Sequence, residues 1–335
     1  MKGGGSRDGA VFDAADPALA QAVKEGLEAV EGRLRVVLAS AHPMLTEVAG
    51  HLAEAGGKRF RPLLALLAAQ LGDPDAPGVV DAAVVVELTH LATLYHDDVM
   101  DEADVRRGAQ SANSRWTNTV AILTGDFLFA RASDLTAGLG TEATRLQSRT
   151  FARLVEGQIA ETAGPGEGQE PVAHHLQVVA DKTGSLIATS ARLGALMAGA
   201  AAADVDTVAR FGEVIGIAFQ LSDDLIDVLS ETGHSGKTPG TDLRGGVHTL
   251  PVLLVLAGQD GGSARLRELL QGDLADDARL AEALALLRAH PAMAQARERL
   301  TSYVEQARAV VVELPAGPAR AALVSLTDFV LARTG

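Results

Sequence analysis

The sequence contains the pattern Asp-Asp-x-x-Asp twice, each time at the end of an apolar segment. The first copy holds Asp97, Asp98 and Asp101, and the second holds Asp223, Asp224 and Asp227. On a helix, the first and third carboxylates of each copy are i, i+4 neighbours and repel one another. Both clusters fall at the expected carboxyl end of a helix, where the dipole disfavours anions. An unfavourable arrangement that occurs twice indicates a bound cation. Oxygen ligands with spare coordination positions favour Mg²⁺, which accepts phosphate oxygens from a substrate.

A solvated helix end in an acidic protein would explain one such cluster, but it explains two copies on similar apolar segments poorly. An EF-hand is excluded, because the spacing lacks the alternate ligands and the central glycine of that loop.

Short basic motifs accompany the aspartates. Only five of the 29 basic residues are lysines, and three of the five lysines lie in these motifs. The motifs comprise Lys58, Arg59 and Arg61 in Gly-Gly-Lys-Arg-Phe-Arg-Pro, Arg106 and Arg107 before a glycine, Lys182 before Thr183, and Lys237 before Thr238. Arginine offers planar donors for bidentate phosphate binding, and lysine offers a compact charge. Each pair alone would suit a solvated surface, but together with the aspartates they indicate anionic, phosphate-bearing ligands. A Walker A loop is absent.

The elements that must position these groups are helical nearly throughout. Apolar residues recur at i, i+3, i+4 and i+7, and the alternation typical of strands is almost absent. Asp16 and Pro17 predict the start of a first helix, and a long apolar helix is expected over about Gly78–Met100. We expect an all-α protein with a flexible segment over residues 1–15 and one helical domain over 16–335.

Composition limits the classes of partner. The 335 residues carry 29 basic and 43 acidic side chains, a net charge of −14, so no nucleic-acid partner is expected. The absence of cysteine excludes disulfides and thiolate metal sites. No signal peptide is apparent, and charge or glycine interrupts the long apolar stretches, so no stable membrane insertion is expected. A cytoplasmic location is the default expectation.

Taken together, these motifs resemble the trans-isoprenyl diphosphate synthases (polyprenyl synthetases), and most of all their bacterial medium- and long-chain members. The resemblance rests on the Gly-Gly-Lys-Arg, Arg-Arg-Gly and Lys-Thr-Gly motifs and on both aspartate clusters, in the family's order and spacing. It runs from about Ala20 to the end of the sequence. It implies an isoprenoid-synthase-type helical bundle around a deep central cavity, usually as a homodimer.

The resemblance also implies roles for individual residues. Metal ligands would be Asp97, Asp98, Asp101, Asp223 and Asp227, which hold Mg²⁺ and an allylic diphosphate. Allylic-diphosphate contacts would be Arg106, Lys182 and Lys237, and the developing allylic cation would lie beside Thr183 and Gln220. The isopentenyl diphosphate site would comprise Lys58, Arg61, His90 and Arg107. The sequence departs from the family after the second cluster, where Gly245 and Val247 replace a glutamate and a lysine. Arg244 and His248 are the candidates to compensate in part for that lysine.

The implied activity is a head-to-tail condensation of isopentenyl diphosphate with an allylic diphosphate (dimethylallyl, geranyl, farnesyl or geranylgeranyl) to an all-trans product. In the family, bulky side chains before the first cluster stop chain growth. Here the corresponding face carries Thr93, Ala92 and Thr89, with Val86 one turn further. This open floor predicts a product of C20 or longer, and rather C30–C50, although ordinary packing of small residues would leave the same pattern.

Two other classes stay open. A class I terpene cyclase shares the fold and a first aspartate motif, but it lacks the paired basic motifs that argue for two diphosphate substrates. A non-catalytic partner subunit of a heteromeric synthase would tend to lose aspartates, and this chain keeps all six.

Overall fold

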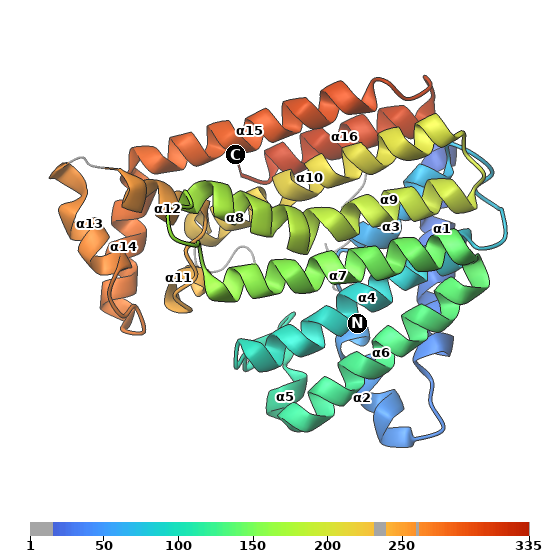
Figure 1. Ribbon diagram of the computed structural model, residues 1–335, viewed down its shortest axis with the longest axis horizontal. Coiled ribbons are helices and arrows are strands. Elements are labelled where there is room, and N and C mark those ends of the chain that lie inside the picture. The colour runs from blue at the N-terminus through green and yellow to red at the C-terminus, as the bar shows by residue number, and fades with distance from the viewer. Residues whose placement is uncertain (1–15, 231–238, 259–260, 335) are drawn as a thin grey trace, which may run out of the picture. The chain divides into compact units, whose positions relative to one another are not determined.

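The computed structural model describes residues 16–230, 239–258 and 261–334, and helices make up nearly all of them (Figure 1). The expected flexible segment 1–15 and Lys237 lie outside the described residues. The helices are α1 (Pro17–Leu38), α2 (Pro43–Glu54), α3 (Phe60–Ala69), α4 (Val79–Met100), α5 (Ala112–Arg115), α6 (Asn118–Leu139), α7 (Thr141–Ala163), α8 (Pro171–Val179), α9 (Ser185–Met197), α10 (Ala202–Leu229), α11 (Thr241–Arg244), α12 (Leu250–Ala257), α13 (Ala264–Leu270), α14 (Asp277–Ala289), α15 (Pro291–Val311) and α16 (Pro318–Ala332). A π-helical turn spans Ala180–Gly184, a 3₁₀ turn spans Gly261–Ser263, and the strands are β1 (Val105–Arg106) and β2 (Ala109–Gln110). The all-α prediction is confirmed.

The chain divides into two compact units, each built from three segments. Unit 1 comprises residues 1–151, 186–212 and 310–329, and unit 2 comprises 152–185, 213–309 and 330–335. The single domain expected over 16–335 stays a prediction.

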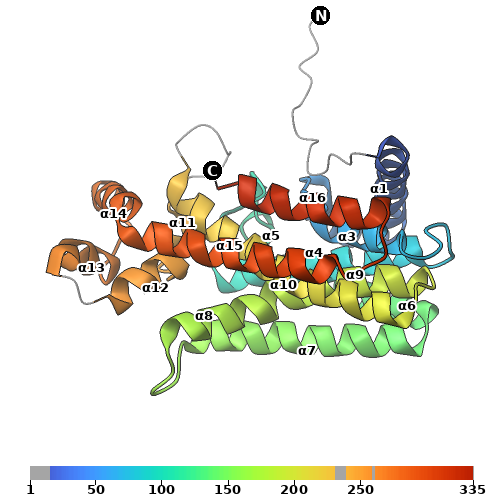
Figure 2. The same ribbon diagram turned by 90° about the horizontal axis from the view of Figure 1, so that it is seen from above.

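In unit 1, α4 is the central helix, and α6 runs beside it (Figures 1 and 2). The start of α1 is as predicted, because the Asp16 carboxylate accepts hydrogen bonds from Ala18 N at 2.9 Å and Leu19 N at 3.0 Å. The predicted apolar helix is α4 itself, and it ends within the first aspartate cluster. The buried side chains of α4 include polar ones, among them those of Glu87 and Asp98.

Among the described residues, α4 is the one helix long and apolar enough to cross a membrane by length and composition. Two-thirds of its most apolar window, 67%, is buried inside the structure. Burial of this kind is typical of the core helix of a folded protein. The sequence had indicated no membrane-spanning helix.

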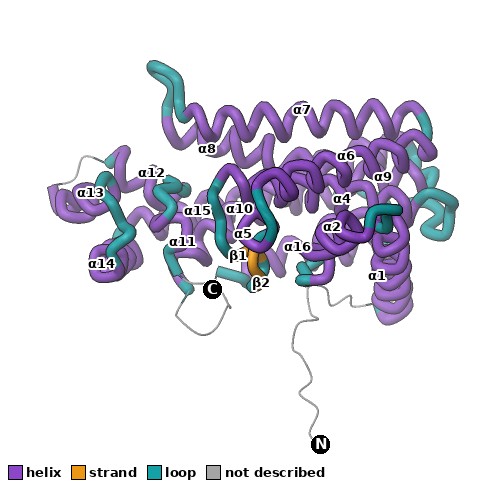
Figure 3. Tube along the Cα trace, turned by 90° about the horizontal axis from the view of Figure 1, so that it is seen from below, coloured by secondary structure: helices purple, strands orange, loops and turns teal. Residues whose placement is uncertain are grey.

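A two-stranded ribbon follows α4 and positions the Arg-Arg-Gly motif (Figure 3). Val105 pairs with Gln110, and Arg106 pairs with Ala109. The two residues of the turn, Arg107 and Gly108, have φ of 54° and 75°. Positive φ at both central residues is the signature of a type I′ hairpin, the turn that matches the twist of its strands. The ribbon therefore fixes where the two arginine side chains leave the backbone.

In unit 2, α12, α13 and α14 lie together (Figure 2). The π-helical turn continues directly from α8 and carries Lys182 and Thr183. Gly157 of α7 packs against it so closely that a Cβ atom would lie 2.9 Å from Asp181 Cβ and 3.1 Å from Lys182 N. Single π-helical turns recur at functional sites, and this one displaces Lys182 from the register of an α-helix.

Candidate active site

The first aspartate cluster forms the carboxyl end of α4, with Asp97 and Asp98 in its last turn and Asp101 as its C-cap. Asp98 is fully buried, and its Oδ1 accepts a hydrogen bond from Arg106 Nε at 2.5 Å. Its Oδ2 is buried and has no hydrogen-bond partner among the described residues. Burial raises the pKa of Asp98, and the charge of Arg106 opposes that effect. Arg106 also lies 3.6 Å from Asp101, so one arginine bridges two members of the cluster.

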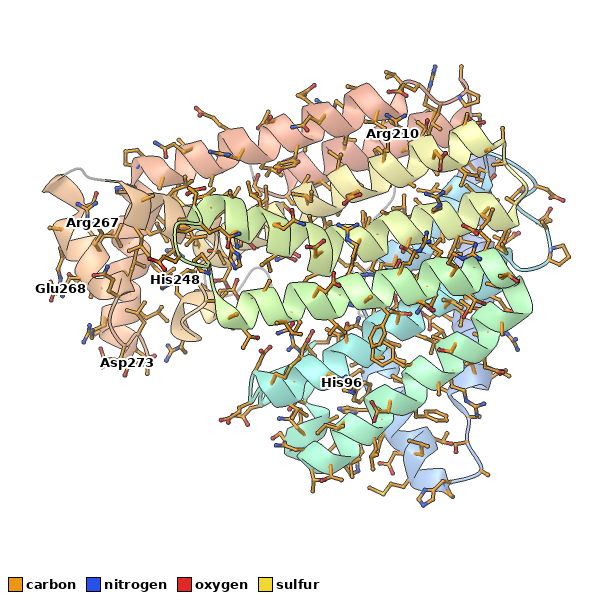
Figure 4. The ribbon with its side chains drawn as sticks, in the orientation of Figure 1. His96, Arg210, His248, Arg267, Glu268 and Asp273 are labelled. Carbon is orange, nitrogen blue, oxygen red and sulfur yellow. The ribbon has the colours of Figure 1, made fainter. Side chains whose placement is uncertain are left out.

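His96, directly before the cluster, fastens this end of α4 to α6 (Figure 4). Its Nε2 lies 3.1 Å from Ile122 O and 3.4 Å from Asp126 Oδ1. The imidazole covers Gly125, where a Cβ atom would lie only 2.3 Å from His96 Nε2. The absence of a side chain at Gly125 therefore lets the imidazole approach the backbone of α6 closely.

A cationic cluster surrounds His90, two turns before the aspartates on α4. Desolvation, with the charges of Arg61 and Arg107, holds the pKa of the half-buried His90 well below its ordinary value. The imidazole is therefore neutral at pH 7. The structure thus gathers His90, Arg61 and Arg107 from three separate segments, as the sequence predicted for one diphosphate site. Lys58 is exposed in the loop directly before α3, the helix that carries Arg61.

Unit 2 holds the second set of predicted residues. Lys182 forms an ion pair with Glu161. Thr183 Oγ1 donates to Gln220 Oε1 at 3.2 Å, and Gln220 Nε2 donates to Asp224 Oδ1 at 3.1 Å. The π-helical turn and α10 are therefore linked through the two residues expected beside the allylic cation.

The other carboxylates of the second cluster have protein partners. Asp223 forms an ion pair with Arg333, whose guanidinium also donates to Ser222 Oγ at 2.8 Å. Asp227 accepts hydrogen bonds from the backbone of Thr241 at 3.1 Å and of Asp242 at 3.2 Å. This helix end thus connects to two later parts of the chain.

The segment that departs from the family borders a cavity of about 550 Å³ in unit 2. Val247 and His248 line this cavity together with His174, His175 and Leu253, and His248 is labelled in Figure 4. Arg244 instead forms an ion pair with Asp277 at 2.5 Å and donates to Ala275 O at 2.7 Å. Arg244 is therefore paired with Asp277 and does not line this cavity. Of the two candidates to compensate for the missing lysine, only His248 is among its lining residues.

The predicted chain-length residues lie on a buried face of α4. Thr89 and Ala92 are fully buried, whereas Thr93 is half-buried and donates to His90 O at 2.8 Å. Thr89 Oγ1 accepts a hydrogen bond from Gln147 Nε2 of α7 at 2.6 Å. This face of α4 therefore meets α7.

Several residues near these sites escaped the sequence analysis. His175 has its Nε2 3.2 Å from Asp224 Oδ2. Glu87 and Arg59 form a buried ion pair at 2.7 Å. Arg333 lies 110 residues after its partner Asp223. None of these pairs has a local sequence signal, because tertiary packing alone brings the partners together.

Comparison with known proteins agrees with these motifs. A family model described as polyprenyl synthetase matches residues 42–287. A nonaprenyl diphosphate synthase from Mycobacterium tuberculosis is 51% identical over 324 residues, which cover 96% of this chain and 97% of that protein. A dimethylallyltranstransferase from the same organism is 44% identical and covers 93% of this chain and 95% of that protein.

Among solved structures, this chain is similar to a geranylgeranyl pyrophosphate synthase from Corynebacterium glutamicum, complexed with calcium and isoprenyl diphosphate. The TM-score is 0.86 at 44% identity, with 96% of this chain and 99% of that chain covered. A polyprenyl synthase from Caulobacter crescentus gives a TM-score of 0.87 at 30% identity, with 99% and 100% covered. The expected isoprenoid-synthase fold and trans-prenyltransferase class are confirmed, and the chain belongs to the polyprenyl synthetase family.

Proposed function

We propose that this chain is a long-chain polyprenyl diphosphate synthase that joins isopentenyl diphosphate head-to-tail to an allylic diphosphate. One observation carries the proposal. A single helix, α4, presents aspartates at its end and, two turns earlier, a histidine surrounded by arginines. The acidic end suits a diphosphate bound through a metal, and the cationic cluster suits a second diphosphate bound directly. An enzyme that joins two diphosphate substrates requires both.

The carboxylates fit a divalent metal of the Mg²⁺ type. No group of three or more metal-ligating side chains stands preassembled in the described part of the chain. Mg²⁺ does not need such a cage, because it keeps several waters and takes one or two carboxylates together with substrate phosphate oxygens. Asp98 Oδ2, buried without a hydrogen-bond partner among the described residues, supplies an oxygen of the required kind. We propose that Asp97, Asp98 and Asp101 are metal ligands in unit 1, and that Asp223 and Asp227 are metal ligands in unit 2.

When bound, Mg²⁺ supplies positive charge to the diphosphate that departs from the allylic substrate. Arg106 and Lys182 would each contribute positive charge to this diphosphate, which favours cleavage of the carbon–oxygen bond to an allylic cation and diphosphate. Thr183 and Gln220 would stabilise that cation, as the resemblance implies. The double bond of isopentenyl diphosphate then attacks it, a carbon–carbon bond forms, and the diphosphate accepts the proton that is lost.

Lys58, Arg61, His90 and Arg107 would hold isopentenyl diphosphate. The neutral imidazole of His90 contributes a hydrogen bond, while the three cations contribute charge.

We propose a product in the C30–C50 range. The small side chains of Thr89 and Ala92 support it, because neither is of the bulky kind that stops chain growth in the family. The name of the nonaprenyl relative supports the same range, whereas the geranylgeranyl relative is named for a C20 product, which is shorter than this range.

We also propose a homodimer. Exposed apolar side chains on α6, Ile122 at 42% and Leu123 at 60%, support a covered face on this helix. Light scattering after size exclusion is the test. A dimer mass that is lost in Leu123→Glu is expected, and a monomer mass for the unmodified chain would contradict the proposal.

The test of the function incubates the purified chain alone with Mg²⁺, farnesyl diphosphate and labelled isopentenyl diphosphate. We expect label in a polyprenyl product longer than C20. A class I terpene cyclase would release diphosphate without incorporating label. A non-catalytic partner subunit would make no product until a second chain is added.

Asp97→Ala links this activity to the first cluster. We expect a loss of turnover of about 10³-fold or more, with circular dichroism unchanged, because charge stabilisation of the leaving diphosphate is the main catalytic contribution. Asp75→Ala, in the exposed turn before α4, is the matched control and should leave turnover unchanged. Near wild-type turnover in Asp97→Ala would exclude the metal assignment.

A further inference from the structure

We propose that Glu87 is a positioning residue that holds the two loops of the isopentenyl diphosphate site in place through Arg59 and Arg107. The proposal deepens the proposed function and rests on it. Glu87 belongs to α4 and lies one turn before His90. Its side chain is only 2% exposed, so it is a buried carboxylate that does not reach solvent.

Glu87 is buried between two arginines. Arg59 Nη1 donates to Glu87 Oε1 at 2.7 Å, and Arg107 Nη2 lies 3.9 Å from the same oxygen. A buried charge is strongly unfavourable unless it is paired and hydrogen-bonded. The pairing therefore works in both directions, because each arginine stabilises Glu87 and Glu87 draws both guanidinium groups to one place.

The backbone at both arginines needs such a constraint. Arg59 has φ of 46° and Arg107 has φ of 54°, values that few residues other than glycine adopt. Each left-handed residue of this kind costs on the order of 1 kcal/mol and persists only where its surroundings hold it. Arg59 and Arg107 are therefore held by their side chains in conformations that their backbones alone would leave.

The same side chains connect the two loops. Arg107 Nη1 donates to Leu52 O at 3.0 Å and to Gly56 O at 2.5 Å, so the Arg-Arg-Gly turn is tied to the end of α2. Gly57 lets this contact form, because a Cβ atom there would lie 3.0 Å from Arg107 Cζ. Arg59 Nη2 donates to Ala53 O at 2.7 Å.

Two proposed diphosphate contacts depend on this arrangement. Lys58 precedes Arg59 in the chain, and Arg61 lies in the first turn of α3, of which Arg59 is the N-cap. The conformation of Arg59 therefore sets the direction of both. Without the carboxylate of Glu87, the two guanidinium groups lose their common counter-charge and repel each other. The two loops are then less ordered in the free protein. Part of the binding free energy of isopentenyl diphosphate is used to order them, so its affinity falls.

The test compares Glu87→Gln with Glu31→Gln. Both remove one negative charge from Arg59, but the Glu31 side chain is 35% exposed whereas that of Glu87 is 2% exposed. We expect Glu87→Gln to raise KM for isopentenyl diphosphate about tenfold or more, as the loss of a buried charge partner would. KM for farnesyl diphosphate should change little, whereas the melting temperature should fall, because two arginines lose a buried counter-charge. Glu31→Gln should leave both KM values within about twofold, because the half-buried Glu31 contacts Arg59 but not Arg107, and the more buried Glu87 still pairs with both arginines.

Arg59→Gln and the double variant Glu87→Gln/Arg59→Gln show whether Glu87 acts through Arg59. If it does, KM for isopentenyl diphosphate in the double variant is no higher than in the single variant that has the higher KM. Additive effects would overturn this route. Equal rises of both KM values, or an unchanged KM for isopentenyl diphosphate in a folded Glu87→Gln protein, would overturn the positioning role itself.

Calorimetric titration with isopentenyl diphosphate separates this proposal from the proposed function. A wild-type protein that does not bind it would contradict both. A wild-type protein that binds it, beside a Glu87→Gln variant of equal affinity, would contradict the role of Glu87 alone. If Glu87→Gln does not fold, Glu87→Asp keeps the charge but shortens the side chain, and the same rise in KM is expected.

Discussion

Replacing His90 by glutamine tests whether the cationic cluster works with a neutral imidazole. Desolvation and the charges of Arg61 and Arg107 keep the pKa of His90 well below its ordinary value, so the folded protein holds it uncharged. A neutral imidazole offers a diphosphate one hydrogen bond and no charge. Glutamine offers the same, so we expect His90→Gln to keep KM for isopentenyl diphosphate within about threefold at pH 7.5. His90→Ala should raise it about two- to tenfold, the equivalent of one hydrogen bond.

The same environment makes stability depend on pH. An unfolded chain protonates its histidines below about pH 6.5, whereas the folded protein keeps His90 neutral to lower pH. The unfolded state therefore binds more protons in mildly acidic solution, and the free energy of unfolding decreases as pH falls below about 6.5. One proton corresponds to at most about 1.4 kcal/mol per pH unit, until the pKa of the folded form is reached. His90→Gln lacks this contribution.

Urea denaturation at pH 7.5, 6.5 and 5.5 measures the difference between wild type and His90→Gln. We expect the wild type to lose up to about 1.4 kcal/mol relative to the variant between pH 6.5 and 5.5. His42→Gln, at an exposed position, is the control for the loss of one histidine. Parallel curves for wild type and His90→Gln would refute the argument. So would a KM for isopentenyl diphosphate that falls steeply as pH is lowered toward 6, because that would indicate a charged imidazole.

Three further substitutions follow from close packing. Gly157→Ala places a Cβ atom 2.9 Å from Asp181 Cβ, so it should shift the π-helical turn that carries Lys182. We expect kcat to fall about tenfold or more, with circular dichroism unchanged. An unchanged kcat would contradict the role of that turn. Gly194→Ala places a Cβ atom of α9 2.0 Å from Ala65 O of α3 in unit 1. Urea denaturation should show a loss of about 3 kcal/mol or more in the free energy of unfolding. Wild-type stability would contradict the close contact between α3 and α9. Ala92→Phe should shorten the product seen by reversed-phase chromatography, and an unchanged length would show that this face does not limit chain growth.

The sequence was sufficient for the elements with local signals. The cap at Asp16, the length of α4 and the place of Asp101 at its end all follow from residue types a few positions apart. The pairing of Arg106 with Asp98 was also within reach, because only eight residues separate them and the ribbon between them is short.

The missed features depend on packing between distant segments. The ion pair of Asp223 with Arg333 joins residues 110 positions apart, and the contact of His175 with Asp224 joins residues 49 apart. The π-helical turn at Lys182 has no periodic signature, because one extra residue per turn is not visible in a pattern of apolar spacing. Glu87 lies in an apolar helix and belongs to none of the sequence motifs. Only the structure shows the two arginines beside it.

The left-handed backbone at Arg59 and Arg107 has a consequence for engineering. A redesign guided by backbone conformation alone would replace both residues with glycine or asparagine, which adopt positive φ at lower cost. Such a protein should melt at a lower temperature and be a poorer enzyme, because the relief of the backbone is smaller than the cost of leaving Glu87 buried without a counter-charge. Thermostable variants of this chain should therefore be sought in the exposed faces of its helices, and these two positions should be held fixed.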